Sequence, residues 1–549
     1  MSERVGPGFT THVVTNQPPP FEDHNLLDAD PALEEGIARE GGGALRDRVH
    51  AYAGVMGSAE TLDLGREANR HPPELTAFDR FGHRIDEVAF HPAWHRLMAL
   101  SMEHAVHALP WREPRPGAHV ARTAMHAILS GVEAGHACPI TMTFACVPAL
   151  RAEKAVAEEW EPRVLSTDYD PASRPASEKR AATLGMAMTE KQGGSDVRAN
   201  TTRAHPLGGD AWELVGHKWF CSAPMSDAFL TLAKTRDDAP PTCFLVPRWR
   251  PDGTRNRFAI QRLKEKLGNR SNASSEIEYR GSWAQRVGPE DRGVRTILAM
   301  VHHTRLDCVS GSTGLMRMAL VQALHHARHR EAFGRHLAEQ PLMRNVLADL
   351  ALEVEAATVL MLRLARAFDA PDDPGERAFA RIATAVAKYW VCKRAPIAIG
   401  EAMECLGGNG YVEEAMLARL YREAPVNAIW EGSGNVICLD VLRAIVREPE
   451  TLPALRAEIG LARGADRRLD AALERLDAEL ADATGAEARA RRLVEALAVA
   501  LQASLLVRGA PAPVADAFCA SRLEGGGSLF GTLPAAVDAA PLLARTLPA

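Results

Sequence analysis

The most informative segment of the chain is Ala187-Met188-Thr189-Glu190-Lys191-Gln192-Gly193-Gly194-Ser195-Asp196-Val197-Arg198-Ala199. It places hydroxyl groups at Thr189 and Ser195 beside the adjacent glycines Gly193 and Gly194. Glycine has no Cβ and tolerates positive φ, so a flat polar ring or a phosphate can approach such a backbone closely. The residues alone predict a polar cofactor-binding loop. An ordinary hairpin turn would explain only the two glycines.

Length and composition describe a globular protein of several domains. A chain of 549 residues is too long for one ordinary core, so we expect two to four domains. Hydrophobic residues make up 46% of the chain and charged residues 24%, which is typical of a soluble protein. The net charge of −6 creates no strong field and gives no general support for nucleic-acid binding.

The cysteines and the apolar segments indicate a cytoplasmic protein without a membrane span. The nine cysteines are scattered without a CxxC pair, which is typical of reduced thiols. The beginning of the chain has no secretory character. The most apolar segment, 494–507, is too short to cross a membrane and contains Glu495 and Gln502.

Changes in residue pattern divide the chain into five regions. The first contains Pro18-Pro19-Pro20 and should be extended. It either lies across a neighbouring subunit or domain, or is a loose tail. The regions are an arm at 1–40, a helical domain at 41–184, a β domain at 185–290, a helical bundle at 291–448 and an extra helical domain at 449–549.

Short strands are predicted in the third region and long helices in the fourth. Leu207-Gly208-Gly209-Asp210 lies between two strand-like runs, as a hairpin loop would. One long helix should end at Gly407-Gly408 and be kinked at Pro396. The predicted strands are 200–204, 212–220, 229–233, 243–247, 258–263 and 276–279.

A second diagnostic segment lies in the C-terminal half of the chain. Together with the first segment it resembles the two signatures of the acyl-CoA dehydrogenases, in the same order. The resemblance implies an α+β fold that is mostly α, with a helical N-terminal domain, a middle β-barrel, a C-terminal four-helix bundle and FAD as cofactor. The second signature comprises Glu404, Gly407, Gly408, Gly410, Tyr411, Glu414, Arg419 and Glu423.

The same resemblance assigns the chemical centre to Ile429-Trp430-Glu431-Gly432-Ser433-Gly434-Asn435. Oxidation of an acyl thioester removes an α-proton while a hydride leaves the β-carbon, so it needs a carboxylate with a raised pKa. The segment resembles the family's base-bearing segment, with Trp430 in place of the usual tyrosine, and Glu431 would be the base. Some family members carry this glutamate elsewhere in the sequence, and an exposed loop glutamate is the alternative interpretation.

The resemblance also implies contacts with FAD and substrate. Arg330, Phe333 and Gln340 match residues that hold the FAD of an adjacent subunit, so the active site would need at least a dimer. Arg305 matches a position near the nucleotide part of the thioester, with a surface arginine as the alternative. The implied flavin contacts are Met186, Met188, Thr189, Gly194, Ser195, Phe220, Cys221, Ser222, Arg330, Phe333, Gln340, Ile429, Trp430, Gly432, Ser433 and Asn435.

Three histidines, His325, His326 and His329, could present ring nitrogens on one helix face as metal ligands. No cluster of carboxylates or cysteines accompanies them in this stretch. We therefore expect a partly packed, solvated histidine patch and no metal site.

Further segments resemble one branch of the family, AidB, which belongs to the bacterial adaptive response to DNA alkylation. The resemblance implies a homotetramer with weak isovaleryl-CoA dehydrogenase activity and an electron acceptor that the sequence does not identify. The segments are Thr11-His12-Val13-Val14-Thr15-Asn16-Gln17-Pro18, Glu133-Ala134-Gly135 with Cys138-Pro139-Ile140-Thr141-Met142-Thr143-Phe144, and Lys266-Leu267-Gly268-Asn269-Arg270-Ser271-Asn272-Ala273-Ser274.

The AidB branch also implies binding of double-stranded DNA through the C-terminal domain. From residue 451 onward, however, eleven arginines face twelve acidic residues. Phosphate binding needs a basic face, which would have to come from segregation of Arg489, Arg491 and Arg492. The sequence therefore leaves two functions open. The protein is either a flavin-dependent acyl-CoA dehydrogenase or a DNA-associated protective protein that retains FAD and has little thioester turnover.

Overall fold

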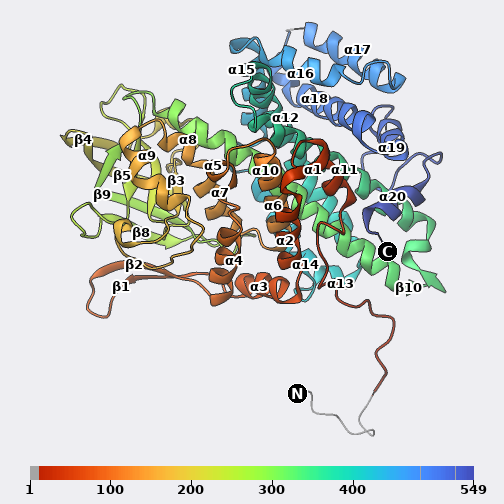
Figure 1. Cartoon of the computed structure of the whole chain (residues 1–549), viewed down its shortest axis with the longest axis horizontal. Helices are drawn as coiled ribbons and strands as arrows, with labels where there is room; N and C mark the ends of the chain where they lie inside the picture. Colours follow the sequence, from red (N-terminus) through yellow and green to blue (C-terminus); the bar gives the residue numbers. More distant parts are fainter. Residues whose placement is uncertain (1–10, 483, 526, 549) are drawn as a thin grey trace.

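The computed structural model describes residues 11–482, 484–525 and 527–548. The strands of the main sheet gather at one end of the molecule and the long helices at the other (Figure 1). The last helices run along one side of the helical part. This order of helical, β and helical parts is the fold expected from the sequence.

The N-terminal region is helical except for one hairpin. Capping residues begin several of its helices, as at Ser58, whose hydroxyl accepts from the Thr61 N–H at 3.2 Å. Its elements are α1 (Pro31–Arg39), η1 (Gly43–Leu45), α2 (Arg46–Met56), α3 (Ala59–Arg70), β1 (Glu74–Phe78), β2 (Arg84–Ala89), α4 (Pro92–Glu103), α5 (Leu109–Arg112), α6 (Ala118–Val132), α7 (Ala137–Ala145), α8 (Val147–Leu150), α9 (Lys154–Val164) and η2 (Ala176–Glu178).

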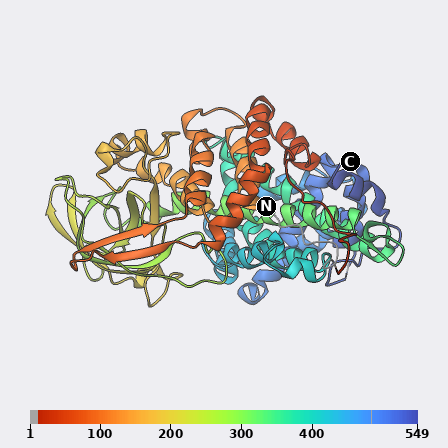
Figure 2. The ribbon, with the colours of Figure 1, turned by 90° about the horizontal axis from the view of Figure 1, so that it is seen from below.

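The hairpin of β1 and β2 departs from the helical pattern predicted for this region. Its strands pair antiparallel, from Glu74 opposite Ala89 to Phe78 opposite Arg84. Leu75 and Val88 pack against the core of the sheet domain, and the hairpin extends beneath that domain (Figures 1 and 2). This contact with a distant part of the chain stabilises strands that local helical spacing did not indicate.

The middle region forms a seven-stranded sheet whose strand order is β3-β6-β7-β9-β5-β4, with β8 also paired to β9. A parallel bridge joins Arg203, at the start of β4, to Lys234 just after β6, so the sheet curls back on itself as the predicted barrel. The strands are β3 (Leu184–Ala187), β4 (Arg203–Gly208), β5 (Ala211–Ser222), β6 (Ala228–Ala233), β7 (Thr242–Pro247), β8 (Phe258–Leu263) and β9 (Ser274–Arg286), with the turn η3 (Val197–Ala199).

The fourth region is a bundle of long helices. Helix α12 continues through Pro396; the kink expected there remains a prediction. The elements are α10 (Gly293–His329), β10 (Glu331–Ala332), β11 (Arg335–His336), η4 (Leu337–Glu339), α11 (Pro341–Phe368), α12 (Pro374–Glu404), α13 (Gly408–Tyr411), α14 (Met416–Glu423), η5 (Ala424–Ala428) and α15 (Gly434–Arg447).

The final helices pack on this bundle and share its hydrophobic core. Polar contacts reinforce the packing: Trp390 donates its indole N–H to Gln502 at 2.9 Å, and Arg522 pairs with Asp349 at 2.6 Å. The helices are α16 (Thr451–Gly460), α17 (Arg467–Ala481), α18 (Ala486–Gly509), α19 (Ala512–Arg522) and α20 (Ala539–Thr546). In the described part of the chain, no helix combines the length and apolarity needed to cross a membrane.

The part of the N-terminal arm that the structure describes packs on its own chain. Phe21 is buried, and the His325 ring nitrogen Nε2 lies 2.8 Å from the Pro19 carbonyl oxygen. The arm therefore runs along the C-terminal end of α10. Val13 and Val14, further toward the N-terminus, are exposed.

Candidate active site

The loop after β3 is stabilised by the buried carboxylate of Glu190. Its oxygens accept from the ammonium of Lys218 at 2.8 Å and from the main chain and hydroxyls of Thr201 and Thr202. Although burial opposes ionisation, the Lys218 charge and these hydrogen bonds lower the pKa of Glu190 to about 2. Glu190 is thus the internal anchor of the first signature.

The anchored loop presents an open, polar surface. Gly193 has a φ of 147°, and an added Cβ there would meet nothing within 4 Å. Gly194 packs directly against Thr189, where an added Cβ would lie 2.4 Å from the hydroxyl oxygen. Ser195 is exposed. The loop therefore offers hydroxyl groups and bare backbone to a ligand, as the sequence predicts.

Strand β5 carries the next predicted contacts. Phe220 is 50% exposed, which is unusual for a phenylalanine in a sheet and leaves an aromatic face available to a flat ring. Ser222 lies beside Cys138 of α7. The side chain of Cys221 points the other way, into the barrel core, so only its main chain is available to a ligand.

Glu431 lies in a turn between η5 and α15, with its main chain in the left-handed region at a φ of 58°. The following Gly432 has a φ of 110°. The Thr304 hydroxyl of α10 donates to Glu431 Oε2 at 2.7 Å. A glutamate with positive φ is uncommon and stores strain, so surrounding contacts must hold this conformation.

Those contacts come from two cationic side chains. Lys388 of α12 is buried and donates to the Trp430 carbonyl at 2.8 Å and also to the Gly432 carbonyl. The Arg305 guanidinium donates to the Glu431 carbonyl at 3.1 Å. Together they fix the main chain on both sides of the carboxylate.

Burial raises the pKa of Glu431 above its ordinary value, while the Thr304 hydrogen bond and the charges of Arg305 and Lys388 oppose the shift. A raised carboxyl pKa is what abstraction of a weakly acidic proton near neutral pH requires. The main-chain contacts therefore fix the position of Glu431, and burial makes its carboxylate more basic.

The predicted contacts from separate regions meet on one apolar cluster. Met186 of β3, Met188 of the first signature and Trp430 of the base loop all pack against the cluster that contains Cys138 and Met142 of α7. The structure therefore brings the first signature, β5 and the Glu431 loop to the same place, between the barrel and the bundle.

Other residues of the base loop are placed at the surface. Ile429 is 65% exposed. Ser433 precedes α15 and is exposed. The Asn435 side-chain oxygen accepts from the Arg491 guanidinium of α18 at 2.8 Å. A predicted flavin contact and a predicted DNA contact are therefore bonded to each other.

Arg305 is held inside the chain rather than extended toward solvent. Its guanidinium pairs with Asp440 of α15 at 2.7 Å, and Asp440 also pairs with Arg381 at 3.1 Å. The nucleotide contact expected for Arg305 remains a prediction, and its visible role is to tie the Glu431 loop to α15.

The hairpin of β10 and β11 lies far from the sheet. Both views show it at the opposite end of the molecule from the barrel (Figures 1 and 2). Phe333 at its tip is 98% exposed with a φ of 54°. Gln340 donates to the Ala332 carbonyl at 3.1 Å. Arg330, Phe333 and Gln340 therefore do not join the other predicted flavin contacts within one chain.

The three C-terminal arginines are engaged within the protein. Arg489 and Arg492 both pair with Glu479, at 3.4 and 2.9 Å, and Arg491 bonds Asn435 as described. The positive charges of Arg489 and Arg492 are thus partly neutralised, whereas Arg491 bonds a neutral amide.

The histidines of α10 make main-chain contacts. His325 contacts the Pro19 carbonyl, and His329 Nδ1 lies 2.8 Å from the His325 carbonyl.

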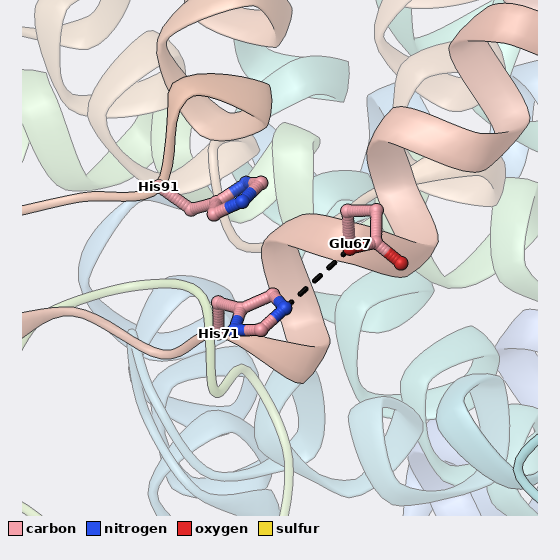
Figure 3. A group of neighbouring side chains, drawn as sticks. All are labelled: Glu67, His71 and His91. Atoms are coloured by element: carbon pink, nitrogen blue, oxygen red, sulfur yellow. Dashed lines mark ion pairs between the residues drawn. The ribbon is translucent and has the colours of Figure 1, made fainter.

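Elsewhere, Glu67, His71 and His91 gather at the end of α3 (Figure 3). There His71 Nε2 lies 3.4 Å from the Glu67 carboxylate, and the two imidazole rings stack. Because His91 Nδ1 accepts from the Ala93 N–H, its Nε2 carries the proton in the neutral ring, which does not suit a metal ligand.

Known proteins support the interpretation of this geometry. The family model of the adaptive response protein AidB N-terminal domain matches residues 16–171, that of the acyl-CoA dehydrogenase middle domain matches 185–281, and that of the acyl-CoA dehydrogenase C-terminal domain matches 291–446. The AidB protein of Escherichia coli (strain K12) is 46% identical over 95% of this chain and 96% of its own length. The chain belongs to the acyl-CoA dehydrogenase family.

Solved structures show the same likeness in three dimensions. ACDH-11 of Caenorhabditis elegans in complex with C11-CoA superposes with a TM-score of 0.85, 28% identity and 94% coverage of both chains. The apo form of Bd2924 superposes with a TM-score of 0.82 and 28% identity, covering 90% of this chain and 99% of its own.

Members of this acyl-CoA dehydrogenase family are FAD-dependent oxidoreductases that act on CH–CH groups, so family membership confirms the expected cofactor and reaction class. The donor set fits FAD: open glycine backbone at Gly193, hydroxyls at Thr189 and Ser195, and a half-exposed aromatic ring at Phe220.

Several functional residues lie outside the predicted set. Lys388, Asp440 and Thr304 fix the Glu431 loop, and Glu190 with Lys218 fixes the first signature. Glu190 lies within the first signature, but the sequence does not indicate that its side chain is buried and stabilises the loop. The helix residues come from positions distant in sequence, and no local pattern distinguishes a buried lysine such as Lys388 from a surface one.

Proposed function

We propose that this protein catalyses the FAD-dependent α,β-dehydrogenation of acyl-CoA thioesters with Glu431 as the base. The observation that supports it is the Glu431 carboxylate, held by Thr304 beside the apolar cluster that also receives Met188, with its pKa raised. A carboxylate of this kind is suited to proton abstraction from a substrate that enters between barrel and bundle.

Glu431 and the side chains that bond its loop have separate roles in the proposed reaction. Glu431 takes the α-proton of the thioester, and the Thr304 hydroxyl at Oε2 leaves Oε1 for that proton. Lys388 and Arg305 keep the main chain of Glu431 in place during the transfer. FAD, when bound, supplies the acceptor for the hydride that leaves the β-carbon. Met186, Met188 and Trp430 provide apolar surroundings that exclude water.

Proton abstraction can be tested apart from hydride transfer. With 3,3-dimethylbutanoyl-CoA, which has α-hydrogens but no β-hydrogen, the protein in D₂O should exchange the α-hydrogens for deuterium, as followed by mass spectrometry. Glu431→Gln should lower the exchange rate by about 10²–10⁴-fold. Glu450→Gln, an exposed glutamate outside both signatures and the Glu431 segment, is the control. Equal exchange by wild type and Glu431→Gln would rule out the assigned base.

The proposed substrates are short or branched acyl-CoAs such as isovaleryl-CoA. The support is the resemblance to the AidB branch and the bulky side chains of Met142, in the apolar cluster, and Trp430, which packs against it. The C11-CoA complex of ACDH-11 marks the long-chain alternative. Initial rates of flavin reduction across a series of chain lengths distinguish the two. A maximum at long chains would contradict the short-chain assignment.

The proposed assembly is a homotetramer in which the β10–β11 hairpin contacts the FAD of another subunit. Phe333, at the tip of the hairpin, is 98% exposed in the single chain, so its apolar ring is available for a subunit contact. The hairpin also lies far from the barrel of its own chain (Figure 1). Light scattering in solution gives the assembly directly.

The second candidate function is binding of double-stranded DNA through α17 and α18. The AidB resemblance favours it, but the ion pairs of Arg489 and Arg492 with Glu479 weigh against a strongly basic face. Two results would support it together. Duplex binding should weaken steeply with salt, and it should be lost when serine replaces Arg489, Arg491 and Arg492. No binding at low salt would exclude it.

The proposed location is the cytoplasm. All nine cysteines are buried free thiols, which suits a reducing compartment. Fractionation of cells with an antibody to the chain would test this location, and recovery in a membrane or secreted fraction would contradict it.

A further inference from the structure

Asn16 of the N-terminal arm bonds the β10–β11 hairpin through its side chain. Its Oδ1 accepts from the Glu331 N–H at 2.7 Å, and its Nδ2 donates to the Glu331 carbonyl at 2.9 Å. The amide therefore pairs with both backbone groups of Glu331, as a neighbouring strand would. A third bond links the same residues, because the Arg330 guanidinium donates to the Asn16 carbonyl at 2.6 Å.

The hairpin needs such a partner. It has only two cross-strand pairs, Glu331 with His336 and Ala332 with Arg335. A two-stranded ribbon of this length is not stable by itself. The side chain of Asn16 extends the ladder on the free edge of β10, and the main-chain carbonyl of Asn16 fixes the direction of Arg330.

Asn16 is suited to this position by its backbone and by its anchors. Its φ of 56° lies in the left-handed region, which asparagine tolerates better than most residues. Three residues later the Pro19 carbonyl contacts His325 at 2.8 Å, and buried Phe21 packs against the same ring at 5.3 Å. The arm is therefore fixed to α10 immediately beyond Asn16.

We propose that Asn16 is a positioning residue for the cofactor-binding hairpin, which it holds so that Arg330 and Phe333 can engage the FAD of a neighbouring subunit. The inference rests on the proposed function, specifically on the assignment of the hairpin to FAD. It gives the arm of this chain a role in cofactor retention.

The test compares FAD affinity among full-length variants. Flavin fluorescence on titration of FAD into apoprotein gives the dissociation constant, and the melting temperature of the apoprotein reports global stability. Asn16→Ala should weaken FAD binding by about tenfold, since two hydrogen bonds are lost. Asn16→Gly favours the left-handed main chain and keeps its carbonyl, so it should weaken FAD binding less than Asn16→Ala does. Thr15→Ala, an exposed neighbour, is the control.

Arg330→Ala tests the premise in the same assay. If Arg330→Ala weakens FAD binding and Asn16→Ala does not, the inference is overturned while the proposed function stands. If Arg330→Ala leaves the affinity unchanged, the hairpin does not hold FAD and the inference fails at its premise. Asn16→Ala and Thr15→Ala could weaken FAD binding equally, or the melting temperature of the Asn16→Ala apoprotein could fall together with its FAD affinity. Either result would mean general destabilisation and would also overturn the inference. A wild-type protein that binds no FAD would instead refute the proposed function.

Discussion

At Glu431 different groups hold the main chain and the side chain. Lys388 and Arg305 bond the carbonyls around the residue, while Thr304 bonds the carboxylate. Substitution of Thr304 should therefore change the pKa of Glu431 without removing its main-chain contacts, whereas substitution of Lys388 or Arg305 removes both such a contact and a charge that lowers the pKa.

The rate of flavin reduction by acyl-CoA should rise with pH through the pKa of Glu431. Burial places this pKa above the ordinary glutamate value, and the base acts only when ionised. The effect on stability has the opposite sign. Folding favours the protonated carboxyl, so its contribution is present at low pH and is lost as the pH rises through the folded-state pKa. Glu431→Gln should flatten both profiles, measured by stopped flow and by thermal unfolding. A rate that does not change with pH from the ordinary glutamate pKa to about five pH units above it would contradict the assignment.

Thr304→Val should raise the pKa of Glu431 further. A hydrogen bond to a charged group contributes about 1.5–3 kcal/mol, which corresponds to about one to two pKa units. The acidic limb of the pH–rate profile should move to higher pH by that amount. Thr313→Val on the same helix, whose hydroxyl bonds only the Val309 carbonyl among the described residues, is the control. An unshifted limb would show that Thr304 does not tune the base.

At the scale of elements, the first signature is a loop held from within. The buried Glu190–Lys218 pair connects it to β5, and the Thr201 and Thr202 contacts connect it to the start of β4. The predicted roles of Thr189 and Ser195 depend on this internal anchor, because a mobile loop could not present their hydroxyls in a fixed direction.

Lys218→Met should destabilise the protein by about 3–5 kcal/mol, because it leaves the Glu190 carboxylate buried without its charge partner. The double variant with Glu190→Gln should recover most of that loss. Chemical unfolding of the four proteins of this mutant cycle measures the coupling. A single variant as stable as the wild type would mean that the pair does not anchor the loop.

Local patterns explain why most strands and long helices could be predicted. Strands β6 and β7 are buried on both faces, and their short apolar runs with flanking turns were sufficient to predict them. The β1–β2 hairpin was not predicted, since Leu75 and Val88 find their partners in the distant barrel. The arm could be predicted as extended, but its contact with α10 depends on tertiary packing.

The candidate site was predictable to a similar extent. Family signatures located the first loop and Glu431 because those segments are contiguous in sequence. Lys388, Asp440 and Glu190 could not be assigned roles, because each acts through a contact that forms only after folding. Arg330 and Phe333 were expected to act in another subunit, and their distance from the barrel agrees with that expectation.

At the scale of the whole molecule, the barrel and the β10–β11 hairpin lie at opposite ends of one chain (Figures 1 and 2). If the hairpin completes a cofactor site, a neighbouring chain must supply it. Assembly and cofactor binding are then linked, and each should strengthen the other.

Phe333→Ser should lower both the mass of the assembly and the affinity for FAD. The phenylalanine is almost fully exposed in the single chain, so its loss should not change the stability of the monomer fold. Light scattering with and without added FAD measures the link, and Phe81→Ser on the β1–β2 turn, 69% exposed, is the matched control. An unchanged mass and affinity would place the subunit contact elsewhere.

We propose above all that FAD, when bound, would oxidise an acyl-CoA whose α-proton Glu431 removes. An anaerobic titration of the purified flavoprotein with isovaleryl-CoA, followed at the flavin absorbance band, tests it most directly. We expect prompt bleaching in the wild type and in Glu450→Gln, with a rate lower by about 10²–10⁴-fold in Glu431→Gln. A bound flavin that stays oxidised with isovaleryl-CoA and with acyl-CoAs of other chain lengths would contradict the claim.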